Sequence, residues 1–90
     1  MSNVPDESPT TRRFYRARSL GALAGALEGA RVTRGLTQED LARAIGSSRP
    51  TISRMERGRP ARTDTLLAVF AECGYELVVV PRGAVVTVMT

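Results

Sequence analysis

Apolar residues recur at helical spacing in four successive segments of the chain. Leu20, Leu23, Leu27 and Ala30 repeat every three or four positions and end near Gly35, which predicts an amphipathic helix. Three shorter segments with the same spacing follow, and each ends at a glycine, the residue that adopts a left-handed backbone most readily. The pattern therefore predicts a mainly helical domain of four to five helices.

The second and third predicted helices are short and have clear boundaries. Thr37 and Ser48 stand where a hydroxyl can cap a helix N-terminus by accepting a hydrogen bond from a free amide of the first turn. Asp40 stands where the acid of a capping box would be. Gly46 ends the second helix and Gly58 ends the third. We expect two short helices joined by a tight glycine turn.

Small and apolar residues fix how these two helices pack. Ala42 is small enough for a close crossing, and the inner faces carry Leu41, Ile45, Ile52 and Met55. This packing leaves one face of the third helix projecting from the domain. A helix of that width fits the major groove of DNA.

The fourth predicted helix has a Thr63 cap, an apolar face of Leu66, Leu67 and Phe70, and a stop at Gly74. The first helix has its own feature, because glycines occupy every fourth position at residues 21, 25 and 29. Close packing or simple tolerance explains such a stripe. Residues 12–18 are basic and form either an arm or the first turn of that helix.

Two valine-rich runs follow the fourth helix and predict a C-terminal β-strand or hairpin. A Pro-Arg-Gly turn at residues 81–83 separates them. An isolated two-stranded ribbon is marginal in water, so this segment is expected to pair with its counterpart across a dimer. The residues expected to do so are Leu77, Val78, Val79 and Val80. The alternative is a tail folded back on its own domain.

Charge points to a polyanionic partner. The chain has 13 arginines, no lysine and nine acidic residues. Between Arg12 and Arg62, 12 arginines face four acids, a net charge of +8 that attracts nucleic acid, although a merely solvated surface is the alternative. The outward face of the third helix carries Arg49, Pro50, Ser53, Arg54 and Arg57. Arginine is the side chain best suited to bidentate contact with guanine.

Residues 31–58, RVTRGLTQEDLARAIGSSRPTISRMERG, resemble the helix-turn-helix of the Cro/phage-repressor (Xre) family, and the resemblance extends in less detail over residues 20–74. It implies base-facing positions, phosphate contacts and one structural ion pair. The base-facing residues are Arg49, Pro50, Ser53 and Arg54; the phosphate-contacting residues are Gln38, Ser48, Arg57, Arg59 and Arg62; the ion pair is Arg31 with Glu56. Pro50 departs from the family, since a polar residue is usual there, and Ser47 replaces an apolar residue.

The stretch GYELVVVPR is similar to HipB-type antitoxins of the same family. This resemblance implies a homodimeric repressor that binds a palindromic operator in double-stranded DNA, autoregulates its operon and neutralises a HipA-like kinase toxin. Two other hypotheses remain: a free-standing regulator of phage, plasmid or host genes, and a protein-interaction adaptor on a degenerate helix-turn-helix.

Composition argues against an enzyme. The chain has no histidine and a single cysteine, so neither a zinc site nor an internal disulfide is expected, and no cofactor is implied. Cys73 is expected to be a half-buried residue near a helix end. No long apolar run or signal peptide is present, which favours the cytoplasm. The predicted organisation is a disordered tail (1–13), a DNA-binding domain (14–75) and a dimerisation segment (76–90).

Overall fold

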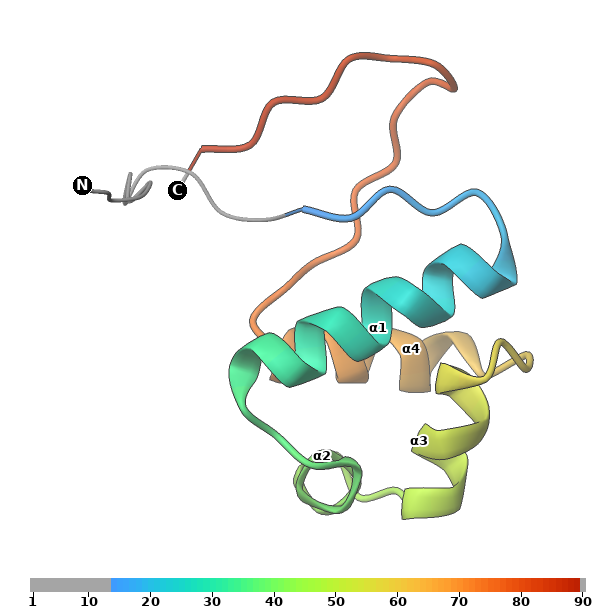
Figure 1. Cartoon of the computed structure of the whole chain (residues 1–90), viewed down its shortest axis with the longest axis vertical. Helices are drawn as coiled ribbons and strands as arrows, with labels where there is room; N and C mark the ends of the chain where they lie inside the picture. The colour runs from blue at the N-terminus through green and yellow to red at the C-terminus, as the bar shows by residue number, and fades with distance from the viewer. Residues whose placement is uncertain (1–13, 90) are drawn as a thin grey trace, which may run out of the picture.

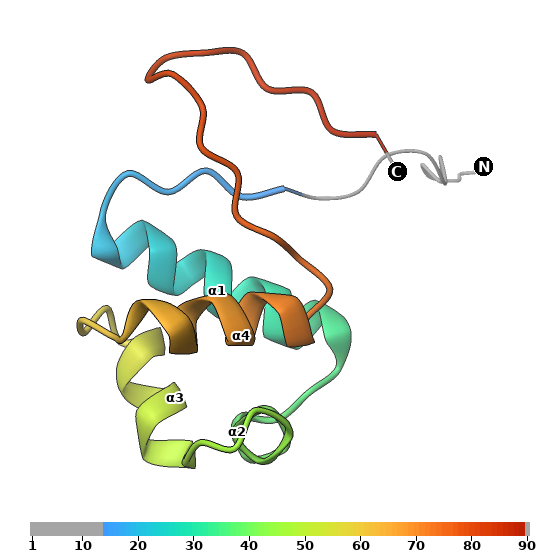
Figure 2. The same cartoon turned by 180° about the vertical axis from the view of Figure 1, so that it is seen from behind.

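The computed structural model describes residues 14–89 and contains four α-helices (Figure 1). They are α1 (Leu20–Arg34), α2 (Gln38–Ala44), α3 (Arg49–Glu56) and α4 (Thr63–Glu72). Helices α1 and α4 lie side by side in both views, and α2 and α3 pack beneath them (Figures 1 and 2). The predicted mainly helical fold with a helix-turn-helix is confirmed. None of the helices in the described region is long and apolar enough to cross a bilayer.

The core forms where the four helices meet. Each helix contributes at least one large, fully buried side chain, and the C-cap residue of α4 adds another. These residues are Leu27, Leu41, Ile52, Val69 and Cys73. Small residues, among them Ala30 and Ala42, allow the helices to approach closely. Helices α1 and α2 pack against the side of α3 that carries the buried Ile52, so the opposite face of α3 is left outside the domain.

Helix α4 differs in two respects from the sequence prediction. Its N-cap is Arg62, which makes no side-chain capping bond, and Thr63 is already the first helical residue. Leu67 is half exposed, while Val69, Phe70 and Cys73 are buried. At about 100° per residue, positions 66, 69, 70 and 73 form one stripe and Leu67 lies beside it. Cys73 is therefore a full core residue, not a half-buried one.

The predicted C-terminal strand or hairpin is absent from the single chain, where residues 75–89 contain no strand. The turn does form, with the Ala84 amide donating to the Pro81 carbonyl at 3.1 Å and Gly83 at φ 83°. Pro81 is the first of the four turn residues, and Arg82 and Gly83 are the two central ones. The two runs then diverge, as Figure 1 shows in orange and red. A strand requires a paired neighbour, and residues 14–89 supply none for the segment 77–80.

Residues 14–19 form an extended arm across α1, and Ser19 begins the helix by accepting a hydrogen bond from the Ala22 amide. The Tyr15 ring packs against Tyr75 with centroids 5.7 Å apart. Arg16 donates to the Ala84 carbonyl at 2.6 Å. The arm thus connects α1 to the C-terminal tail. The predicted disordered tail at residues 1–13 lies outside the described residues.

Candidate nucleic-acid interface

The helix-turn-helix begins with a complete capping box. The Thr37 hydroxyl accepts a hydrogen bond from the Asp40 amide at 3.0 Å, and the Asp40 carboxylate accepts one from the Thr37 amide at 3.1 Å. The Thr37 amide holds the pKa of the Asp40 carboxyl below its usual value, because the bond favours the charged form. The predicted capping box is confirmed, and it sets the direction in which α2 leaves the loop.

The turn between α2 and α3 depends on Gly46, whose φ of 70° is strained for other residues. The Ser47 amide donates to the Ala42 carbonyl at 2.8 Å and closes the end of α2. The Ser48 hydroxyl then caps α3 by accepting from the Thr51 amide. Pro50 lies in the first turn of α3, where its missing amide removes no helical bond. The turn is therefore the rigid element that orients α3.

The outward face of α3 is open to solvent. Ile52 is fully buried and Met55 nearly so, which fixes the inner side of this helix. Arg49, Pro50 and Arg54 are exposed on the other side. Among the described residues, the guanidinium groups of Arg49 and Arg54 have no hydrogen-bond or ion-pair partner. These two cations are therefore available to an external ligand.

Ser53 and Arg57 are joined on that same face. The Arg57 Nη1 donates to the Ser53 Oγ at 2.5 Å, and Arg57 is the C-cap residue of α3. The family resemblance predicts a base contact for Ser53 and a phosphate contact for Arg57. Their bond could have been anticipated from the four-residue spacing, which brings side chains together on a helix.

Arg31 and Glu56 tie α1 to α3 through a bidentate ion pair. The Arg31 Nε lies 2.5 Å and its Nη2 3.0 Å from the two Glu56 carboxylate oxygens, and both side chains are largely buried. The Glu56 hydrogen bond raises the pKa of the Arg31 guanidinium. Arg31 also donates to the Leu36 carbonyl at 2.7 Å. These bonds hold the back of α3 against the domain.

Gln38 joins this network, which the sequence did not indicate. Its side-chain nitrogen donates to Glu56 at 3.0 Å, so its amide group lies at the junction of α1, α2 and α3. Arg62 is also engaged, because it forms a bidentate pair with Asp64 at 2.9 and 3.0 Å. Arg62 correspondingly lowers the pKa of the Asp64 carboxyl. Of the predicted phosphate-contacting residues, these two are thus already held by acidic side chains.

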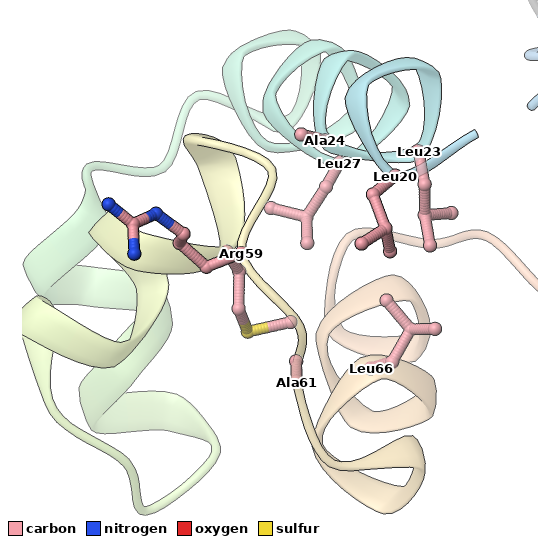
Figure 3. A pocket seen from close by; sticks show the side chains of 8 residues that line it. Leu20, Leu23, Ala24, Leu27, Arg59, Ala61 and Leu66 are labelled. Atoms are coloured by element: carbon pink, nitrogen blue, oxygen red, sulfur yellow. The ribbon is translucent and has the colours of Figure 1, made fainter.

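Arg59 lies beside a small apolar recess between α1, α4 and the loop that precedes α4 (Figure 3). Leucines of α1 and α4 line it, and the guanidinium of Arg59 points away from them toward solvent. The recess measures about 100 Å³. Small-molecule sites usually occupy about 300–1,000 Å³, so this recess is too small to be one of them.

Known proteins share this sequence pattern and this helix-turn-helix geometry. The family model described as helix-turn-helix matches residues 27–80. A solved chain in the "Structure of HipA-HipB-O2-O3 complex" is 26% identical, with a TM-score of 0.69; the match covers 77% of this chain and 99% of that one. A chain of the "HipB-O4 20mer complex" matches with the same identity and coverage and a TM-score of 0.70.

A HipB variant in complex with an O2 20mer is 25% identical to this chain, with a TM-score of 0.71, and covers 78% of it. The match spans 99% of that HipB chain. No curated protein matches the sequence. The similarity thus extends over nearly the whole length of each of these solved chains.

Proposed function

Because the chain belongs to the helix-turn-helix family, we propose that it is a sequence-specific DNA-binding repressor whose α3 enters the major groove. One observation carries this proposal: α3 is held rigidly from behind while its outer face presents unpaired arginines to solvent. Because these arginines have no partner among residues 14–89, their binding to DNA breaks no existing ion pair there. The alternative adaptor role gives no reason for unpaired cations on this face.

Two kinds of contact are proposed for this interface. Base contacts are assigned to Arg49, Pro50, Ser53 and Arg54, with Pro50 limited to an apolar touch on a thymine methyl group. Phosphate contacts are assigned to Gln38, Ser48, Arg57, Arg59 and Arg62, which lie at the N-termini of α2 and α3 and just after the C-terminus of α3. The bonds from Gln38 to Glu56 and from Arg62 to Asp64 would have to rearrange or be shared on binding.

The dimerisation segment is proposed to be residues 76–90, appended to a DNA-binding domain at residues 14–75. Support comes from exposure: Val79 is 98% exposed and Val78 70% exposed in the single chain, in a segment where valine favours strands. A symmetric pair of such segments would satisfy both edges and bury these valines. Two copies of α3 would then read successive major grooves of a palindromic operator about 34 Å apart.

A role as antitoxin is proposed from the solved relatives. A HipB chain that matches this one is found in a complex with HipA, and the match covers 99% of that chain. We extend this to the present chain: it represses its own operon and binds a HipA-like kinase as a cytoplasmic, non-enzymatic partner. The kinase would be encoded in the neighbouring reading frame.

Sequence-specific binding can be tested with the full chain and a labelled duplex enriched from a random library. At about 0.15 M salt, we expect affinity at least a thousandfold above that for a scrambled duplex of equal composition. Equal affinity for both duplexes would exclude a sequence-specific regulator. The region upstream of the gene, used as a third duplex, tests autoregulation: binding at the scrambled level would exclude it.

The antitoxin role needs a different experiment. The adjacent reading frame is expressed alone and together with this chain, and growth and complex formation are measured. We expect a kinase that arrests growth alone, is tolerated with this chain and co-purifies with it at fixed stoichiometry. A neighbouring product that is harmless, or that does not bind, would leave a DNA-binding regulator without a toxin.

A further inference from the structure

Arg57 is the C-cap residue of α3 and follows its last helical residue, yet its guanidinium lies over the middle of that helix. Its Nη1 donates to the Ser53 hydroxyl oxygen, four residues toward the helix N-terminus. Helical side chains lean toward the N-terminus in general, and this bond fixes that direction. The charge of Arg57 is thus placed one turn closer to the residues assigned to base contacts than its position in the chain indicates.

The angular position of Arg57 points to the same face. With about 100° per residue, Arg57 lies about 140° from the buried Ile52 and about 160° from the buried Met55. Arg49, by the same count, lies only about 60° from Ile52. Arg57 is therefore closer to the centre of the outward face than an arginine already assigned to base contact.

The bond to Ser53 preserves the charge of Arg57. Arg31 and Arg62 are held by carboxylates, which neutralise them. Ser53 is neutral, and it engages one of the five N–H donors of the guanidinium. The remaining donors keep the planar fork that matches the N7 and O6 atoms of guanine, and the fork has already lost part of its rotational freedom before binding.

We propose that Ser53 and Arg57 form one base-reading unit, in which Arg57 makes the bidentate contact with a guanine and Ser53 positions it. This inference rests on the proposed DNA-binding function and changes the role of both residues within it. Arg57 becomes a specificity-determining residue, not a phosphate contact. Ser53 becomes a positioning residue that acts through Arg57.

The test is a selection of bound sequences from a duplex library with a random core, using the full chain and its variants. Arg57→Lys keeps the charge but loses the bidentate fork, and Arg57→Ala loses both. Ser53→Ala removes only the hydroxyl group that accepts the hydrogen bond from Arg57. Arg82→Ala is the matched control, because it removes one charge from the tail turn, at the end of the molecule away from α3 (Figure 1).

We expect Arg57→Lys and Arg57→Ala to lower the preference for guanine at one position of each half-site by about tenfold or more, with the other positions unchanged. Ser53→Ala should weaken the same position by a smaller factor. The double variant with Arg57→Ala should be no worse than Arg57→Ala alone. Arg82→Ala should leave the selected sequence unchanged.

Three results would overturn the inference. Retained preference with uniformly weaker binding in Arg57→Ala, rescued by Arg57→Lys, would make Arg57 a phosphate contact. An effect of Ser53→Ala at a different position would separate the two residues. A wild-type chain that enriches no sequence would overturn the proposed function itself, and the inference with it. Circular dichroism of each variant checks that its total helical content and thermal unfolding match those of the wild type.

Discussion

The space beside one glycine of α1, Gly29, is filled by the side chain of Tyr15 from the N-terminal arm. A Cβ added at Gly29 would lie 2.6 Å from the Tyr15 hydroxyl and 2.9 Å from its ring. A Cβ added at Gly25 meets nothing within 4 Å. The glycine stripe seen in the sequence therefore has more than one cause: close packing explains Gly29, and tolerance explains Gly25.

This difference gives a matched pair of substitutions. Gly25→Ala should raise the free energy of unfolding by about 0.8 kcal/mol, because alanine favours the helix interior. Gly29→Ala should lower it by about 1 kcal/mol, since the Tyr15 ring must move away from Tyr75. Urea denaturation measures both. In a Tyr15→Ala background the two substitutions should become equivalent, and a persistent difference would contradict this explanation.

Glu56 is the acceptor that holds Arg31 and Gln38 together. Glu56→Ala should lower the free energy of unfolding by about 3 kcal/mol, because it leaves the largely buried Arg31 charge without an acidic partner. Glu56→Gln should cost less, since one acceptor oxygen remains. Glu72→Ala, an exposed acid removed from the last turn of α4, is the control and should change stability by less than about 0.5 kcal/mol. Equal effects of the two alanine variants would contradict a structural role for the ion pair.

At the scale of the element, α2 depends on charge at its first turn. The Asp40 carboxylate accepts from the Thr37 amide, and this bond keeps the pKa of Asp40 lower in the folded chain than its ordinary value of 3.8. A group with a depressed folded pKa stabilises the fold above its unfolded pKa. That contribution is lost as the pH falls through the folded pKa.

Asp40→Asn should therefore be less stable than the wild type at neutral pH, and the two should converge as the pH falls below about 4. Urea midpoints across this range measure the difference. Glu76→Gln, a charge removal in the exposed tail, controls for net charge. A gap between Asp40→Asn and the wild type that stays constant with pH would show that the carboxylate charge does not contribute to the cap.

At the scale of the whole molecule, most of the valines of the tail are exposed in the single chain. The core residues all lie between positions 24 and 73, so the tail adds little to the fold of one chain. Its exposed apolar side chains gain free energy only in an assembly. The tail extends along the side of the molecule opposite α2 and α3, so it leaves the outward face of α3 uncovered (Figure 2).

Val79→Gln should weaken dimerisation at least about tenfold while leaving the helical content unchanged, because Val79 is almost fully exposed in the single chain. Sedimentation equilibrium measures the dissociation constant. Leu67→Gln is the control, since it makes the same change at a half-exposed site on α4. A dimer that is weakened by Leu67→Gln and not by Val79→Gln would move the interface from the tail to α4.

Much of the helix-turn-helix could be predicted from the sequence because local chemistry decides it. The Thr37 capping box, the Ser48 cap and the Gly46 turn each depend on residues within a few positions of one another. The outward position of Arg54, about 160° from the buried Ile52, follows from helical periodicity alone. Local hydrogen bonds and backbone conformation need no knowledge of distant contacts, so these features were determined by the sequence itself.

Tertiary structure decided the features that depend on residues distant in the chain. Only packing brings Tyr15 onto Gly29 and Gln38 onto Glu56. The valine-rich tail marks the limit of local prediction, because β propensity identifies a segment that can pair but supplies no partner. A helix closes its hydrogen bonds within itself, whereas a strand must find them elsewhere.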